Sequence, residues 1–180
     1  MMKRTIALLA LTASLFTSCN SEPTLQRYFV DKAEDKNFLA VDISPTFIKT
    51  DKLQLTPQEQ MALKSLKNVN IIAFKANDKN AGAYEKELTN VKKILKDDSY
   101  EELIKFNRGT MGASINTKGE SQNIEELILF ANDKTNGFGV VRVTGENMTP
   151  NNVMTIVGLL QKANLDMEQL KPLKAMIERK

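Results

Sequence analysis

The chain has 180 residues with 25 lysines and arginines, 22 aspartates and glutamates, one cysteine and no histidine or tryptophan. Without histidine it can form no Ser-His-Asp or Cys-His catalytic pair and no imidazole site for zinc, and one thiol can form no internal disulfide. The near-neutral balance of charge gives no electrostatic case for nucleic acid. No Walker loop or strand-linked Gly-x-Gly-x-x-Gly motif is present, so we expect no nucleotide cofactor.

The start of the chain predicts export. Lys3 and Arg4 precede an apolar run over Ile6–Phe16, and Thr17-Ser18-Cys19 follows it, which resembles a bacterial lipoprotein signal. The run is too short to span a bilayer, because about 30 Å of hydrocarbon takes about 20 helical residues. We therefore interpret residues 1–18 as a signal peptide and Cys19 as the lipidation site. An ordinary cleaved signal with a stray cysteine and an uncleaved anchor remain alternatives.

Residues 19–23 form a short tether between the lipid and the first structured segment. The four residues 20–23 that follow the lipidated cysteine reach only about 13 Å when extended, so the domain should sit close to the membrane. Residues 24–36 then predict an amphipathic helix. Its residues Leu25, Tyr28 and Phe29 could lie on the membrane surface or pack on the helix's own domain. The mixed charges of its polar face favour packing on the domain.

The first half of the folded part alternates strand and helix. Residues 37–43 predict a strand, Thr56-Pro57-Gln58-Glu59 predicts the capped start of a helix, and residues 69–75 predict a buried second strand. Strand, helix and strand in this order predict a right-handed βαβ unit, whose strands are parallel. The most regular amphipathic helix of the chain follows at residues 81–96.

The second half of the chain predicts strands that follow one another directly. Their ranges are 100–106, 109–118, 124–131 and 138–144. Asn136-Gly137 between the last two strands is a hairpin signal, because both residues tolerate a positive φ. We therefore expect an antiparallel meander.

Two helices are predicted at the C-terminal end. Thr149-Pro150 starts a helix that runs to about Ala163. Because apolar residues lie around most of its circumference, we expect this helix to be sandwiched between other elements. Asp166 caps a last helix, whose apolar positions are Leu170, Leu173, Met176 and Ile177.

Together the elements predict one α+β domain over residues 24–180. It should contain a mixed sheet of about six strands, helices mainly on one face and a C-terminal helical pair.

Paired carboxylates are the first candidates for chemistry, since two acids can share general acid-base work. The candidates are Asp97-Asp98, Glu101-Glu102 and Glu125-Glu126. Neighbours in a strand point to opposite faces, so we interpret these pairs as solvated charge and expect no catalytic residue. Residues 132–137 contain the residue types of a calcium-binding loop, but their spacing does not place oxygen ligands at the positions that such a loop requires. A hairpin turn explains the same residues, so no metal is expected.

Arg142 is a cation in the middle of an apolar strand. It could face a groove and hold an anion or a carboxylate of a partner, which makes it our candidate interaction residue. Alternatively, it could lie on a solvent-facing side between Val140 and Thr144 and pair with Glu125 or Glu126 across the hairpin. We favour this structural role.

Three features of the chain match one family pattern. They are the signal that ends at Cys19, the stretch Tyr100-Glu101-Glu102-Leu103 after a lysine-rich helix, and the hairpin over 124–145 that closes in Val-Thr-Gly. In these features the chain resembles small lipoproteins of Bacteroidota that carry domain of unknown function family 4252. The resemblance implies lipidation at Cys19 and supplies no activity or catalytic residue. With one acid in residues 20–23, it implies the periplasmic face of the outer membrane rather than the cell surface.

These observations predict a non-enzymatic envelope lipoprotein that is held at the membrane through its N-terminal lipid. It would bind another envelope protein or act in envelope signalling or maintenance. The alternative is a hydrolase that acts on glycan with carboxylates alone, two acids lying about 5–10 Å apart in a cleft. Converging buried acids would favour the hydrolase, whereas a filled domain with an apolar or edge-strand surface would favour the binding module. A carrier of small hydrophobic molecules would need an empty cavity under the sheet.

Overall fold

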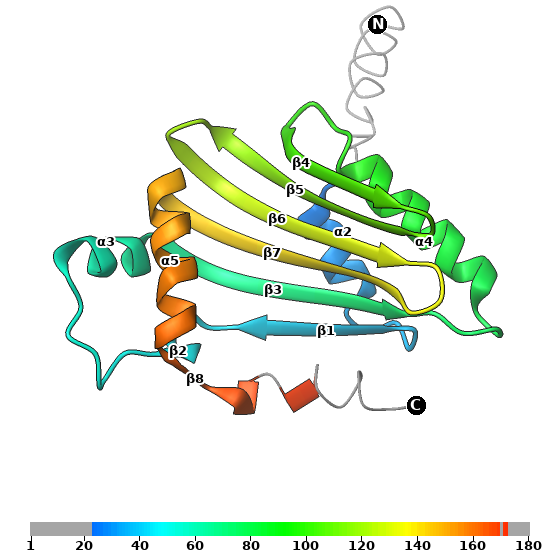
Figure 1. The fold of residues 1–180 in the computed structure, drawn as a ribbon. Helices are drawn as coiled ribbons and strands as arrows, with labels where there is room; N and C mark the ends of the chain where they lie inside the picture. The colour runs from blue at the N-terminus through cyan, green and yellow to red at the C-terminus, as the bar shows by residue number, and fades with distance from the viewer. Residues whose placement is uncertain (1–22, 170, 173–180) are drawn as a thin grey trace, which may run out of the picture.

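A six-stranded antiparallel sheet forms the centre of the computed structural model, which describes residues 23–169, 171 and 172 (Figure 1). Its strands are β1 (Phe38–Ile43), β3 (Leu66–Lys75), β4 (Tyr100–Arg108), β5 (Met111–Glu120), β6 (Asn123–Asp133) and β7 (Gly137–Met148). They lie in the order β1-β3-β7-β6-β5-β4, and every neighbouring pair is antiparallel. The predicted α+β class, single domain and number of strands are confirmed, but the sheet is not mixed.

The predicted βαβ unit is wrong, because β1 and β3 run antiparallel, with Ile43 opposite Val69. Helix α3 (Pro57–Ser65) ends directly before the first residue of β3. No connecting residues are left to carry the chain back over the face of the sheet, as a parallel crossover requires. Helix α3 lies instead at the end of the strands, where it packs against α5 (Pro150–Lys162) (Figure 1).

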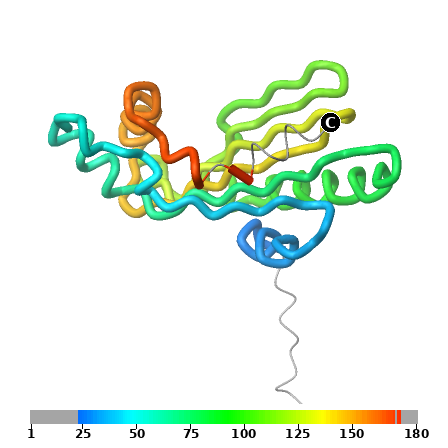
Figure 2. The backbone as a smooth tube through the Cα atoms, turned by 90° about the horizontal axis from the view of Figure 1, so that it is seen from below, coloured from blue at the N-terminus to red at the C-terminus, as the bar shows by residue number. Residues whose placement is uncertain are grey.

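Helices cover both faces of the sheet. Helices α2 (Leu25–Lys32) and α4 (Ala81–Ile94) lie on one face, and α5 crosses the other (Figure 2). The expectation of helices mainly on one face is therefore wrong. The reason is visible in β3, where alternate positions are apolar on both sides: Ile72 packs in the core under α2 and α4, and Ile71 packs toward α5.

The larger core lies between the sheet and the helices α2 and α4. Leu25, Tyr28 and Phe29 are buried in it, so α2 packs on its own domain as the charge pattern predicted. Phe74 and Phe138 stack in the middle of this core with ring centroids 5.6 Å apart. Burial of such large side chains is the main source of stability in a domain of this size.

The second core lies between α5, α3 and the opposite face of the sheet. Its members include Val41, Ile43 and Val69 from the sheet, with Ile156 and Leu160 of α5 packed against them. This core occupies only the end of the sheet near α3. Helix α5 is not sandwiched as predicted, because its Met154 and Val157 side chains are exposed.

Threonine caps begin three of the helices. The side chains of Thr24, Thr56 and Thr149 accept hydrogen bonds from the backbone amides of Arg27, Glu59 and Asn152. Thr56 and Glu59 form the full capping box that the sequence predicts. These local signals therefore fixed the helix starts correctly.

The predicted hairpin between β6 and β7 is confirmed, but its turn is longer than predicted. Asp133 pairs with Gly137, so residues 134–136 form the loop. The Asp133 carboxylate accepts hydrogen bonds from the backbone amides of Thr135 and Asn136, which fixes the turn. Positive φ is found at Gly137 (118°) rather than at both residues of the Asn-Gly pair.

Several predicted features lie outside the described residues. They are the signal peptide over 1–18, the lipidation site Cys19, most of the tether over 19–23, and the last helix beyond residue 172. A short ladder of β2 (Ile48–Lys49) with β8 (Asn164–Leu165) leads to that C-terminal region. None of the helices within the described ranges is long and apolar enough to cross a membrane.

Candidate interaction surface

An apolar trough crosses five strands on the face of the sheet that carries α5. Strand register builds its floor from small residues: Ala73 lies opposite Gly139, Gly139 opposite Ala131, and Ala131 opposite Ala113. Phe106 of the edge strand β4 lies opposite Ala113 and closes this row. Because the floor has almost no side-chain volume, it lies lower than the rows on either side of it.

The two rows that flank the floor differ in character. On the side toward α5 the row is aliphatic and consists of Ile71, Val141, Leu129, Ile115 and Ile104. On the other side the row is partly polar and consists of Lys75, Gly137, Asp133, Met111 and Arg108. Arg108 has no ion-pair partner among the described residues. The trough therefore has one aliphatic flank and one flank that carries charged side chains.

Large apolar side chains of the trough are open to solvent. Ile104 is 59% exposed, Phe106 52% and Leu129 40%. Within residues 23–169 and 171–172, no helix covers these side chains, because α5 crosses the sheet closer to α3 (Figure 1). Isolated exposed apolar residues are common, but a contiguous patch of this kind marks an interaction site.

The trough has the dimensions of an α-helix. Neighbouring strands lie about 4.8 Å apart, so the floor of small residues from Ala73 to Ala113 runs about 14 Å, the length of a helix of about 10 residues, and Phe106 closes its end. The flanking rows are two residues to either side, about 7 Å from the floor each, which suits a helix about 10 Å in diameter. Two adjoining hollows of about 460 and 480 Å³ lie along it.

Arg142 does not face this trough. Its side chain lies on the face covered by α2 and α4, where it forms a two-pronged ion pair with Glu126: Nε to Oε2 is 2.9 Å and Nη2 to Oε1 is 2.8 Å. The predicted pairing across the hairpin is confirmed for Glu126. The expected solvent-facing position is wrong, because Arg142 and Glu126 are only 11% and 12% exposed and the neighbouring Val140 is fully buried.

The Arg142–Glu126 pair belongs to a polar row across the sheet. Asn70 accepts a hydrogen bond from Arg142 Nη1 at 3.4 Å and donates one to Asp42 at 2.6 Å. Burial alone would raise the pKa of the Glu126 carboxyl, but the hydrogen bonds and charge of Arg142 outweigh it and hold that pKa below its usual value. The row therefore ties neighbouring strands together. Contact of Arg142 with a partner stays a prediction.

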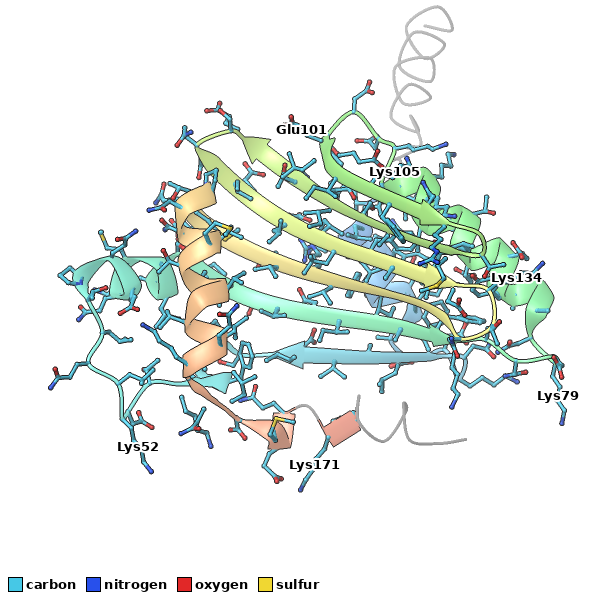
Figure 3. All side chains as sticks on the ribbon, in the orientation of Figure 1. Lys52, Lys79, Glu101, Lys105, Lys134 and Lys171 are labelled. Atoms are coloured by element: carbon cyan, nitrogen blue, oxygen red, sulfur yellow. The ribbon has the colours of Figure 1, made fainter. Side chains whose placement is uncertain are left out.

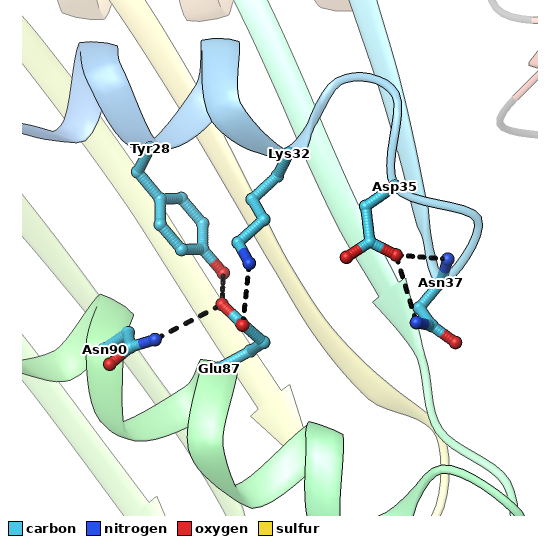
Figure 4. A network of polar contacts seen from close by, with 6 residues as sticks. All are labelled: Tyr28, Lys32, Asp35, Asn37, Glu87 and Asn90. Atoms are coloured by element: carbon cyan, nitrogen blue, oxygen red, sulfur yellow. Dashed lines mark hydrogen bonds and ion pairs between the residues drawn. The ribbon is translucent and has the colours of Figure 1, made fainter.

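A second polar network joins α2 to α4 (Figure 4). The buried carboxylate of Glu87 accepts hydrogen bonds from Tyr28 Oη at 3.0 Å and from Lys32 Nζ at 2.7 Å. Asn90 of the same helix adds a longer contact at 3.4 Å. Burial and the neighbouring Glu87 raise the pKa of Tyr28, so its hydroxyl stays a donor. This network fixes the first helix of the domain on the face opposite the trough.

The carboxylate pairs of the sequence do not converge. Glu126 is committed to Arg142, whereas its neighbour Glu125 points to the opposite face of β6 and is exposed. Asp97 accepts a hydrogen bond from the backbone amide of Ser99. Among the described residues, no group of three or more metal-ligating side chains comes together.

Sequence reasoning missed the trough. Its small residues Ala73, Ala113, Ala131 and Gly139 come from four strands and make no motif along the chain. Their alignment depends on register across four strands, which is fixed only when all the hairpins are placed. One signal in the sequence is the pair Ile104 and Phe106, two large apolar residues at alternate positions of one strand.

Comparison with known proteins gives one match. A family model described as "Domain of unknown function (DUF4252)" matches residues 28–156. That range begins inside α2, includes the whole six-stranded sheet and ends inside α5. No curated protein and no solved structure matches the chain.

Proposed function

We propose that this chain, which belongs to the family described as a domain of unknown function (DUF4252), is a lipid-anchored, non-enzymatic lipoprotein of the bacterial cell envelope that binds another envelope protein. The observation that carries this proposal is the exposed apolar trough. It has the size of a helix-binding groove, and helix-in-groove binding is a common mode of peptide recognition. The anchor would be an acyl group on Cys19, at the periplasmic face of the outer membrane.

The direction of the anchor supports a protein rather than a membrane as the occupant of the trough. The tether leads into α2, which packs on one face of the sheet, and the trough lies on the other face. A membrane held by the tether would adjoin the α2 side. The trough then faces away from the bilayer, toward other proteins of the envelope.

The chemistry of the trough defines the partner segment. The small floor and the aliphatic flank favour an amphipathic helix whose apolar stripe carries large side chains, since large residues pack best into a floor of Ala and Gly. Arg108 on the other flank favours an acidic residue beside that stripe. The occupant we propose is therefore an acidic amphipathic helix of another protein.

The ion pairs formed by the buried acids support a binding role over catalysis. The rival reading requires two acids with separated pKa values that face one cleft. Glu126 and Glu87 are the least exposed acids with described partners, and both are held in ion pairs on the helix-covered face. Neither lines the trough.

Anchoring is tested by Cys19→Ser, because serine cannot carry the thioether-linked lipid. We expect the wild type to stay with membranes until detergent is added and the variant to become soluble in cell fractionation. Mass spectrometry of the wild type should show a mature chain that begins at an acylated Cys19. An unacylated chain that retains residues 1–18 would contradict the proposed anchor.

Binding is tested by photo-cross-linking in whole cells. A photoreactive phenylalanine analogue at position 106 or 129 should cross-link to one other envelope protein, whereas the same group at Lys93, on the exposed side of α4, should not. Ala131→Asp should abolish the cross-link, since it places an unpaired carboxylate on the floor of the trough. Cross-links to the chain's own C-terminal part, to a second copy, or to lipid would contradict the proposed partner.

A further inference from the structure

A second candidate site lies on the opposite face, where the β4–β5 hairpin extends past α4. Two adjoining hollows of about 200 and 300 Å³ lie between them. Their charged lining residues are four lysines, Lys92, Lys96, Lys105 and Lys134, and two glutamates, Glu85 and Glu102. Figure 3 places Lys105 and Lys134 at the side of the sheet where α4 lies. We call these two hollows the basic groove.

The charge of the basic groove is only partly compensated. Glu102 forms an ion pair with Lys105 at 3.0 Å. Lys92, Lys96 and Lys134 have no ion-pair partner among the described residues. Lys92 borders both hollows, Lys96 borders one and Lys134 the other. With Glu85 as the one unpaired carboxylate of the described lining, the groove keeps an excess of positive charge, which attracts an anion.

Two buried polar atoms in the groove lack partners. The Tyr84 side chain is 3% exposed, and its hydroxyl lies beside the side-chain amide of Asn132. Neither that hydroxyl nor Asn132 Oδ1 makes a hydrogen bond of regular geometry to a described residue. Burial raises the pKa of Tyr84, with a neighbouring Asn132 acting against the rise, so the hydroxyl keeps its proton as a donor. Buried polar groups are normally satisfied, so unpartnered ones that line a hollow point to a polar ligand or ordered water.

We propose that the basic groove binds a phosphate group, held by Lys92 and Lys134 as charges and by Tyr84 as a hydroxyl donor, while Lys96 adds positive charge from the adjoining hollow. Lysine ammonium groups and O–H donors are common phosphate ligands, and a phosphate has enough oxygen acceptors to use all of them. Asn132 Oδ1 then accepts a hydrogen bond from a hydroxyl of the molecule that carries the phosphate.

The groove lies on the same face as α2, the helix into which the tether leads. The phosphate of an anionic lipid headgroup is therefore one source, and this source rests on the anchoring proposed above. A soluble phosphate ester is the other source and does not depend on an anchor. Both present the same chemistry to the groove.

The test is calorimetric titration of the full chain, purified in non-ionic detergent, with glycerol 3-phosphate. We expect saturable binding that Lys92→Ala/Lys96→Ala weakens about tenfold and Tyr84→Phe weakens about fivefold, since each variant removes donors that a charged phosphate would use. The matched control is Lys86→Ala/Lys93→Ala. It removes the same charge from α4 at positions outside the groove and should leave the affinity unchanged.

A second arm separates the two sources. The Cys19→Ser chain, which cannot be lipidated, is sedimented with phosphatidylcholine vesicles that contain or lack phosphatidic acid. Sedimentation only with phosphatidic acid, lost in Lys92→Ala/Lys96→Ala, assigns the groove to a lipid headgroup, and binding of glycerol 3-phosphate alone assigns it to a soluble ester. Absence of saturable binding, or an equal loss in the control variant, overturns the proposal whatever the outcome for the anchor.

Discussion

Arg142 of β7 donates hydrogen bonds to both carboxylate oxygens of Glu126 of β6, from Nε to Oε2 at 2.9 Å and from Nη2 to Oε1 at 2.8 Å. The pair lies on the face of the sheet covered by α2 and α4. The two residues are not directly opposite, because Arg142 pairs in register with Ile128. The ion pair therefore runs diagonally across the hairpin, and Asn70 extends it to β3. Tyr100 Oη lies 3.5 Å from the Glu126 carboxylate, and neither member of the pair lines any of the hollows described above.

Removing one member of this pair should destabilise the fold strongly. Arg142→Met leaves the Glu126 carboxylate largely buried without a cation, and we expect it to lower the free energy of unfolding by about 2–4 kcal/mol. The double variant Glu126→Met/Arg142→Met should recover most of that loss, because it leaves no buried charge. Urea denaturation of the three proteins measures both effects. Equal stability of the single and the double variant would show that the Glu126 carboxylate left without a cation carries no penalty in the fold.

Acid should act on this pair with a definite sign. The pKa of Glu126 is lowered in the folded state, so its contribution to stability is present above the unfolded value of about 4.3 and is lost as pH falls through the folded pKa. In Arg142→Met, burial is the largest influence left on Glu126 and raises its pKa against the smaller effects of Lys118 and Tyr100, so protonation becomes easier. Urea midpoints at pH 7, 5 and 4 should therefore show the gap between wild type and variant narrowing as pH falls. A gap that widens would contradict this account.

Tyr28 and Tyr100 offer a matched pair of hydroxyl deletions. Tyr28→Phe removes a 3.0 Å hydrogen bond to the buried Glu87, so we expect a loss of about 1–2 kcal/mol in the free energy of unfolding. Tyr100→Phe removes only a 3.5 Å contact with Glu126, which keeps both bonds from Arg142, and should cost less than about 0.5 kcal/mol. Thermal unfolding by circular dichroism compares them. The network around α2 would be unimportant if Tyr28→Phe were the milder change.

Signals that act within a few residues were predictable from the sequence. Thr56 and Glu59 contain the whole capping box, and the β6–β7 hairpin follows from the turn chemistry of Asn136-Gly137 between two apolar runs. Strand direction was not predictable in the same way. Whether β1 and β3 run parallel depends on where the intervening helix packs, and α3 packs at the end of the strands, against α5.

The candidate site shows the same limit more sharply. Arg142 could be singled out because a charged residue in an apolar strand is recognisable from the sequence of that strand alone. The trough is invisible there, because Ala131 and Gly139 look unremarkable until β5, β6 and β7 are placed side by side. Only the tertiary arrangement turns small residues into a groove.

Two glycines should respond in opposite directions to alanine. At Gly137 the backbone has φ of 118°, and an added Cβ would lie 1.9 Å from the carbonyl oxygen of Phe74, so Gly137→Ala must break the pairing of β3 with β7. We expect it to lower the free energy of unfolding by more than about 3 kcal/mol. Gly158 lies inside α5, where an added Cβ meets no atom within 4 Å, and Gly158→Ala should raise the stability by about 0.5–1 kcal/mol through helix propensity. Urea denaturation measures both, and destabilisation by Gly158→Ala would show that α5 is held differently from the packing described.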